Sequence, residues 1–475
     1  MQLETTLHLD DIVEMTNVAE HLSEQDRKVI AKHVIDTFEI DRMSRSQWEH
    51  EMAMANKIAL QVKEEKSFPW PGAANVKFPL ITIACLQYHS RAYPALIDMP
   101  DVVKVIPASG RQPSLQPNPQ LQPGGAPGQM QPQQPQPPSP QITEAERNWT
   151  AAQAVQDHMN WQLSEEDEQW EAETDKTILV QALMGCCFKK IYFDPLKRHN
   201  VSECVLPQDL IVSYYTRSLE DASRITHILT WSGNKLIEMQ NRGMILDVDV
   251  TDAPKVVPVM FGELQQVRDQ RQGLNQIATD PDQPFIILEQ HLFLDLDDDG
   301  YKEPYVAWVK HDSQELLRIA PRFLPSGMEY ARPDSKSDKK LIRIVPEKFF
   351  TKYGFIPAPD GGFYDLGFGK LLGPLNESIN TSINQLCDAG TLKNAGGGFI
   401  ARGVRTKSGE VSMRPALWMR VDCVGDDLRK NIVPLPVPEP STVLFQLLSL
   451  LIDYGQRVAG APDIVQGQNP GQNTP

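Results

Sequence analysis

Apolar residues recur at helical spacing over residues 20–66, and the second half of this range carries large side chains three or four positions apart on one face. The same spacing predicts a polar helix over 261–276 and a further helix over 373–392. Residues 440–460 are apolar on nearly all sides apart from a narrow polar seam. Such a helix is typically buried among neighbouring elements.

Runs of β-branched and aromatic residues predict strands over 186–194 and 209–215, and two more strands within 285–310. The charged stretch that follows, up to about residue 365, has no clear periodicity. It therefore predicts mostly irregular structure. Residues 67–79 hold three prolines and a glycine among large apolar side chains, which indicates a rigid, packed loop.

The segment 107–141 differs in kind from the rest of the chain. It contains 11 prolines and 10 glutamines, and Arg111 is its only charged residue. Such a composition buries too little apolar surface to offset the entropy lost on ordering, so an exposed disordered insertion is predicted. A helix is expected directly after it, because Thr143 and Glu146 have the spacing of a capping box.

The stretch "FLDLDDDGYKEPY" (293–305) contains the D-x-D-x-D-G opening of a calcium loop. Position 12 of such a loop requires a bidentate Glu, yet here it falls on Val306. The flanking residues favour strands, and Pro304 argues against a following helix. We therefore predict a tight hairpin turn, with weak calcium binding as an alternative. Four aspartates form its charged tip: Asp295, Asp297, Asp298 and Asp299.

The composition narrows the class of partners. The chain has 475 residues and a net charge of −16, without a long Lys/Arg run, which disfavours tight binding of DNA or anionic membranes by bulk charge. Six cysteines without a C-x-x-C pair indicate a reducing compartment. The N-terminus lacks the apolar run of a signal peptide, and no apolar segment is long enough for a bilayer, so we predict cytoplasmic synthesis and no membrane partner.

Arrangements typical of catalysis are missing from the sequence. The stretch "GFGKLLG" (367–373) fails the P-loop spacing, and the chain has neither G-x-S-x-G nor H-E-x-x-H. We therefore predict no enzymatic activity, no cofactor, and no catalytic or metal-binding residue. A hydrolase among the abundant carboxylates is a remaining alternative, supported only by their number.

Four blocks of the sequence stand out: "FPWPGAANVKFPLITIACLQYHSRAYPALI" (68–97), "DLDDDGYKEPY" (295–305), "GFYDLGFGKLLGPLNESINTSINQLCDAGTLKNAGGGFIARG" (362–403) and "EPSTVLFQLLSLLIDYGQRVAGAPDIVQGQNPGQNTP" (439–475). These four blocks resemble portal proteins of tailed bacteriophages. Together the blocks reach across nearly the whole chain apart from 107–141, which looks like an insertion.

This resemblance implies a structural protein without enzymatic activity, located in the virion at one capsid vertex and made in the host bacterial cytoplasm. In the family, about twelve copies close into a ring, the head-to-tail connector. The implied partners are further copies of the chain, the terminase large subunit, the major capsid protein and scaffold, the head–tail adaptor, and double-stranded DNA. The DNA passes through the channel during packaging and again during ejection.

The fold class implied is α+β: a portal protomer with an α/β wing, long stem helices and a β-rich clip, assembled as a ring. The expected segments are the N-terminal helical wing (1–106), the disordered insertion (107–142), the α/β wing (143–254), a first stem helix region (255–284), the clip (285–364), a second stem helix (365–392) and a wing return (393–475) with a tunnel-side helix at 441–459.

Two sites follow from this resemblance. Asn376, Asn380 and Asn384 share one face of the second stem helix and are candidates for the channel or for a stem interface, with a solvated stripe as the alternative. The acidic turn would lie on the clip and face the terminase or adaptor. A calcium-dependent structural or binding module using the 295–300 turn is the alternative function. Because the last block is followed by further helix in the family, the chain is expected to continue beyond Pro475.

Overall fold

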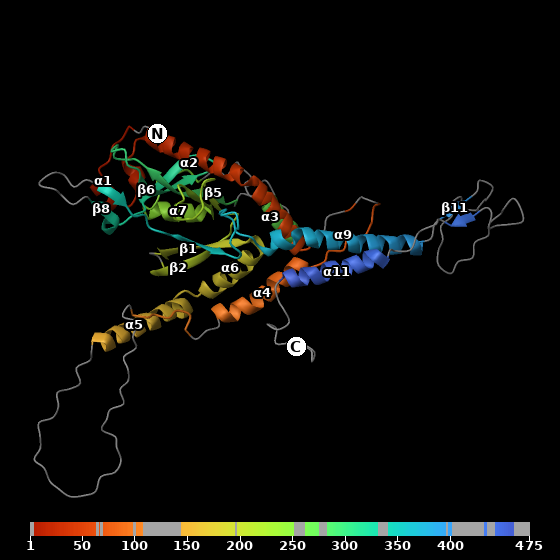
Figure 1. Ribbon diagram of the computed structural model, residues 1–475. Coiled ribbons are helices and arrows are strands. Elements are labelled where there is room, and N and C mark those ends of the chain that lie inside the picture. The colour runs from red at the N-terminus through yellow and green to blue at the C-terminus, as the bar shows by residue number, and fades with distance from the viewer. Residues whose placement is uncertain are drawn as a thin grey trace, which may run out of the picture.

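Figure 1 shows the computed structural model of the chain, which combines a body of sheets with a group of long helices. The structure describes residues 4–62, 66, 70–97, 101–107, 144–194, 197–250, 262–274, 283–330, 341–395, 398–400, 432–434 and 442–459. The predicted disordered insertion, apart from residue 107, and the predicted helix cap at Thr143 lie outside these residues.

Helices and antiparallel sheets occur together among the described residues, which confirms the predicted α+β class.

The helix predicted over 20–66 is divided at Arg45, whose buried guanidinium donates to the backbone oxygens of Pro207, Gln208 and Leu210. The helices are α1 (Leu9–Glu14), η1 (Val18–His21), α2 (Glu24–Ser44), α3 (Ser46–Ala59), α4 (Leu80–Leu96), α5 (Glu144–Trp161), η2 (Gln162–Glu166), α6 (Trp170–Met184), α7 (Gly233–Asn241), α8 (Gly262–Gln272), η4 (Pro325–Gly327), α9 (Phe368–Ala395) and α11 (Thr442–Val458).

The strands pair antiparallel throughout. A five-stranded sheet has the order β3-β4-β5-β6-β7, a three-stranded sheet has the order β10-β1-β2, and β8-β9 and β11-β12 form separate pairs. The strands are β1 (Cys186–Asp194), β2 (His199–Val205), β3 (Leu210–Val212), β4 (Ile225–Trp231), β5 (Phe285–Leu294), β6 (Glu303–Lys310), β7 (Glu315–Pro321), β8 (Met328–Tyr330), β9 (Leu341–Ile344), β10 (Phe350–Gly354), β11 (Gly398–Ile400) and β12 (Ile432–Pro434).

Three strand predictions are confirmed: the strand at 186–194 and the two within 285–310. The strand expected over 209–215 is shorter and covers Leu210–Val212. The prediction of mostly irregular structure up to residue 365 is wrong, because β7, β8, β9 and β10 lie there. These strands are short, so their alternation is too brief to be recognised from sequence.

Strand β5 is the centre of the largest core. It is buried along nearly its whole length, since it has a strand on each side and a helix over each face. Leu288 packs with Phe38 of α2, whereas Ile287 faces the opposite side and packs with Leu236 of α7. This two-sided burial explains why the sequence of β5 is apolar at consecutive positions rather than alternating.

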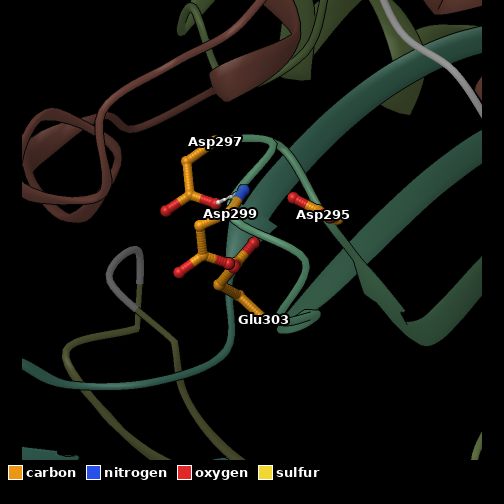
Figure 2. A group of neighbouring side chains, drawn as sticks. All are labelled: Asp295, Asp297, Asp299 and Glu303. Carbon is orange, nitrogen blue, oxygen red and sulfur yellow. Dashed lines mark hydrogen bonds between the residues drawn. The ribbon is translucent and has the colours of Figure 1, made fainter. Parts of the chain in front are cut away.

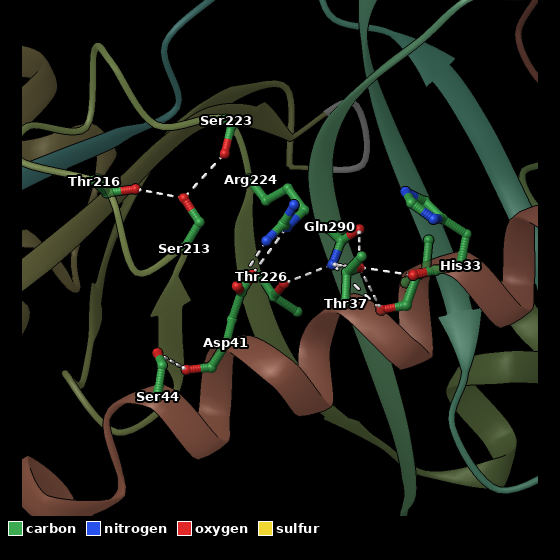
Figure 3. Close-up of polar contacts among 11 residues, drawn as sticks. His33, Thr37, Asp41, Ser44, Ser213, Thr216, Ser223, Arg224, Thr226 and Gln290 are labelled. Atoms are coloured by element: carbon green, nitrogen blue, oxygen red, sulfur yellow. Dashed lines mark hydrogen bonds and ion pairs between the residues drawn. The ribbon is translucent and has the colours of Figure 1, made fainter. Parts of the chain in front are cut away.

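Helix α2 is also held to the sheet by buried polar contacts (Figure 3). Arg224 on the segment before β4 forms two hydrogen bonds with the Asp41 carboxylate, at 3.0 and 2.8 Å. Gln290 of β5 donates from Nε2 to Thr226 Oγ1 at 3.0 Å and to Thr37 Oγ1 at 3.3 Å. Because each of these polar groups is satisfied, the contacts fix the position of α2 over the sheet.

The ranges expected to form a wing (143–254) and a clip (285–364) share both main sheets. Strand β4 pairs with β5, and β1 pairs with β10. In this chain the two ranges therefore pack as one body of sheets rather than as two separate units.

A second layer is made of helices. Helices α9 and α11 run side by side and extend away from the sheets, with α4 below them (Figure 1). Their shared core contains Leu80 and Ile81 of α4, Leu372 and Ile379 of α9, and partly buried side chains of α11. Across the described ranges, no helix combines the length and the apolar character that a membrane crossing requires.

Candidate functional site

The asparagine row of α9 lies inside the helical layer. Asn376, Asn380 and Asn384 have exposed fractions of only 0%, 8% and 6%. Their side chains face residues 74–81, the end of the proline-containing loop and the start of α4. None of the described strands pairs with this segment, so its backbone groups need other partners.

Two of the amides bind the backbone around Phe78. Asn376 donates from Nδ2 to the Phe78 oxygen at 3.0 Å and accepts at Oδ1 from the Ile81 amide at 3.3 Å. Asn380 Oδ1 accepts from the Phe78 amide at 2.6 Å. An amide side chain suits this role because it both donates and accepts.

The row continues one and two helical turns further along α9. Asn384 donates to the Val76 oxygen at 3.2 Å and accepts from the Val76 amide at 2.7 Å. Asp388 Oδ1 then accepts from the Ala74 amide at 2.7 Å. The prediction that the asparagine row faces a channel, a neighbouring stem or solvent is therefore wrong. The row is buried within the chain, and its side chains supply hydrogen-bond partners for the backbone of residues 74–81.

One face of α11 packs closely on α4 and α9. The close approach centres on buried Gly455, where an added Cβ would lie 2.8 Å from Leu80 Cδ2 and 3.2 Å from Leu375 Cδ2. The partly buried Leu448 and Leu451 of α11 join the same core. Glycine at this position lets α11 approach its neighbours more closely than a larger residue would allow.

A second apolar face of α11 is open to solvent. Val443, Leu447, Leu450 and Tyr454 follow one another at i, i+4, i+7 and i+11 and are 69%, 44%, 65% and 61% exposed. We call these four residues the α11 stripe. The prediction that residues 440–460 form a helix buried on nearly all sides is wrong for the described part of the chain, since only the face around Gly455 is covered.

The acidic turn connects β5 to β6, and the predicted hairpin is confirmed. Asp295 accepts from the Gly300 amide at 3.2 Å, and Asp297 accepts from the Asp299 amide at 3.3 Å. Asp298 and Asp299 are exposed, as expected for a charged tip. Asp295 and Asp297 are instead half-buried and lie toward the interior of the turn, as Figure 2 shows.

Glu303, the first residue of β6, joins these aspartates, and the sequence analysis missed it. Its carboxylate lies with those of Asp295, Asp297 and Asp299, and one ligand oxygen from each of the four falls within 4.8 Å of the others. Burial, followed by the nearby Asp297 carboxylate, raises the pKa of Glu303 to about 7. The available signal was a Glu at position 9 of the loop, whereas an EF-hand loop has its bidentate Glu at position 12.

A further group of charges lines a cavity of about 560 Å³ beside the two main sheets. Glu289 of β5 forms an ion pair with Lys190 of β1, with 2.6 Å between Oε2 and Nζ. His291 Nε2 lies 3.2 Å from the other Glu289 oxygen. The pKa of Glu289 is held well below its usual range, since Lys190 and His291 outweigh the opposing effect of burial.

His227 of β4 is the third basic group near Glu289. Its Nδ1 lies 3.9 Å from Glu289 Oε2, but burial lowers its pKa to about 4, so the imidazole is neutral at pH 7. Burial also lowers the pKa of His291. The arrangement therefore holds one buried salt bridge flanked by neutral imidazoles, which links the two sheets.

Three separate features of the described residues are therefore candidates for function. They are the buried asparagine row of α9, the exposed apolar stripe of α11, and the four convergent carboxylates of the β5–β6 turn. No known family model matches the chain. A comparison with curated proteins also found no match.

Proposed function

We propose that this chain is the protomer of a bacteriophage portal ring, the head-to-tail connector at one capsid vertex. The four sequence blocks that resemble portal proteins support this proposal. The ring, of about twelve copies, conducts double-stranded DNA during packaging and ejection and has no enzymatic activity of its own. The terminase large subunit, the head–tail adaptor, the major capsid protein and the scaffold bind to it.

The α11 stripe is the observation that carries the ring proposal. Four large apolar side chains at consecutive helical turns form a continuous exposed surface, and such surfaces mark interaction sites. The polar residues of α11, such as Gln446, Ser449 and Asp453, lie on another side of the helix. We assign the stripe to contact with a second copy of this chain.

A ring requires a second surface on the same protomer, because a head-to-tail interface joins two different patches. Helix α5 offers one. Its Val155 and Met159 are one helical turn apart on the same face and are 49% and 40% exposed. In the proposed ring, the stripe of one protomer packs on an apolar surface of this kind in the next.

The net charge of the chain supports the proposal that DNA passes through the ring. A net charge of −16 makes the protomer repel DNA phosphates on average, which suits a channel that DNA slides through without being held. The exposed tip of the acidic turn, Asp298 and Asp299, is proposed to face the terminase or the adaptor.

Native mass spectrometry and negative-stain microscopy of the purified full chain test the proposal. We expect closed rings of about a dozen copies, as head-to-tail closure demands. A chain that stays monomeric at high micromolar concentration contradicts it.

The variant Leu450→Glu tests the interface itself. A charge in the centre of the stripe should convert rings to monomers, because an unpaired carboxylate would be buried at the contact. Ser449→Glu, on the polar side of the same helix, is the matched control and should leave the rings intact. Both variants should keep the circular dichroism spectrum of the unchanged chain. Rings of unchanged stability in Leu450→Glu would remove the stripe from the interface.

A further inference from the structure

The four carboxylates at the β5–β6 turn match the size of a cation shell. One ligand oxygen each from Asp295, Asp297, Asp299 and Glu303 lies within 4.8 Å of the other three (Figure 2). Oxygen ligands lie 2.3–2.6 Å from Ca²⁺, so two on opposite sides of the ion are about 4.6–5.2 Å apart. Around Mg²⁺ the same separation is at most about 4.2 Å, since its ligands lie at 2.0–2.1 Å. Separations within 4.8 Å fit the Ca²⁺ shell. Four protein carboxylates at one site also favour Ca²⁺, since Mg²⁺ usually keeps several waters and takes only one or two carboxylates.

Acidic side chains at a turn are common without any ligand, so the decisive observation concerns Glu303. Glu303 is completely buried, with an exposed fraction of 0%. Its Oε2 accepts from the Leu296 amide at 3.4 Å and from the Tyr305 hydroxyl at 3.3 Å. Its Oε1 has no hydrogen-bond donor among the described residues, and neither has the buried Oδ1 of Asp295.

A buried carboxylate oxygen without a donor is costly, and three further carboxylates nearby increase the cost. Protein donors do not solve this problem at the turn. The amides of Asp299, Gly300 and Tyr301 donate to Asp297, Asp295 and Asp299 respectively, and none of them reaches Glu303 Oε1. A cation at the centre of the four carboxylates would supply the missing positive charge to all of them at once.

The spacing along the chain fits this role. The ligands occupy positions 1, 3, 5 and 9 of a loop in which position 6 is Gly300, at φ +87°. A glycine at position 6 provides the sharp turn that lets successive aspartates converge. A calcium loop between helices adds a Glu at position 12, but here β6 begins at position 9 and directs Glu303 inward instead.

We propose that the β5–β6 turn binds one calcium ion through Asp295, Asp297, Asp299 and Glu303. This assignment revises the sequence-based prediction that the chain has no metal-binding residue. It does not depend on ring formation, because all four ligands come from one turn of one protomer.

The ion would stabilise more than the turn itself. The Leu7 amide donates to the Leu296 oxygen at 2.9 Å, which ties the N-terminal segment to the loop. On the other side, the Ile344 amide of β9 donates to the Tyr301 hydroxyl at 3.2 Å. Calcium binding should therefore reduce hydrogen exchange at Leu7, Leu296 and Ile344 as well as within the loop.

Calorimetric titration of the full chain with CaCl₂, after treatment with EDTA, tests the proposal. We expect one site per chain and a calcium-dependent rise in melting temperature, because the ion binds only the folded turn. Glu303→Gln and Asp297→Asn should each weaken calcium binding at least tenfold. Asp298→Asn is the matched control: it removes the same charge from an exposed position outside the four ligands and should leave binding nearly unchanged.

The melting temperature of Glu303→Gln separates binding from folding. Without calcium, this variant should melt at or above the temperature of the unchanged chain, because the neutral amide removes a buried charge. With calcium, the unchanged chain should instead melt at a higher temperature than the variant. The absence of any calcium effect on the unchanged chain, an equal effect in Glu303→Gln, or tighter binding of MgCl₂ than of CaCl₂ would each overturn the proposal.

Discussion

Two helix faces in the helical layer reverse the usual pattern, in which apolar side chains are buried and polar side chains are exposed. On α9 three asparagines are buried, while on α11 four large apolar residues are exposed. The asparagines are buried because each amide completes the hydrogen bonds of a backbone segment that has no strand partner. The apolar stripe has no comparable partner among the described residues, so its partner is expected in another copy. A buried polar row thus indicates an internal contact, and an exposed apolar row indicates an external one.

The largest effect is expected at Asn376, the fully buried member of the asparagine row. Asn376→Ala would leave the part-buried Phe78 oxygen and the buried Ile81 amide without their partners, which should lower the free energy of unfolding by about 2–4 kcal/mol. Denaturant titration followed by circular dichroism measures this. Thr381→Ala, on the exposed side of α9, is the control and should change stability by less than about 0.5 kcal/mol. Equal effects in both variants would show that the row contributes nothing beyond ordinary helix packing.

The next largest effect is the pH dependence of stability. The asparagine row does not contribute to it, because asparagine side chains do not titrate. His227 has a pKa of about 4 in the folded chain because of burial, below its ordinary value of 6.5. As pH falls below 6.5, the unfolded chain takes up a proton that the folded chain does not. Above pH 6.5, His227 therefore has no effect on the free energy of unfolding. Between pH 6.5 and pH 4, its protonation in the unfolded chain should lower the free energy of unfolding by about 3 kcal/mol.

Unfolding free energies measured between pH 7.5 and pH 4 test this expectation. His227→Gln should flatten the profile, whereas His21→Gln, at an exposed position, should leave it unchanged. A profile that is equally steep in both variants would assign the pH dependence to other groups.

The smallest effect is expected on the covered face of α11. Gly455→Val would place new atoms against Leu80 and Leu375, and we expect a loss of about 1–2 kcal/mol after the neighbouring side chains adjust. Gln456→Val, at the adjacent exposed position, supplies the same residue without the crowding. Differential scanning calorimetry of the two variants gives the difference. A Gly455→Val chain that is as stable as Gln456→Val would mean that α11 is held only loosely on α4 and α9.

Local signals in the sequence were sufficient for part of the local structure. The strands at 186–194 and within 285–310 and the turn between the latter two follow from alternation, β-branched residues and the D-D-G turn. The four-residue stripe of α11 is also visible as a helical pattern. Periodicity defined the faces of α9 and α11 correctly but not what they contact.

The missing information was long-range. The partners of the asparagine row lie 295 to 308 positions earlier in the chain, a distance at which helical spacing carries no signal. The fourth carboxylate of the acidic turn was missed for a different reason. Glu303 points inward because β6 starts there, and its role depends on that strand boundary rather than on the helix-flanked spacing of an EF-hand.

The position of Asn17 has a consequence for synthesis of the protein. Its Oδ1 accepts from the Ile319 amide at 3.1 Å, across 302 positions of the chain. At about 5–20 residues per second, a ribosome needs roughly 15 to 60 s to reach Ile319 after making Asn17. During that interval the sheet that α2 covers is incomplete, because β7 (Glu315–Pro321) has not been finished. The nascent chain should therefore be a substrate for chaperones that bind exposed apolar helices, and its yield in cells should depend on them.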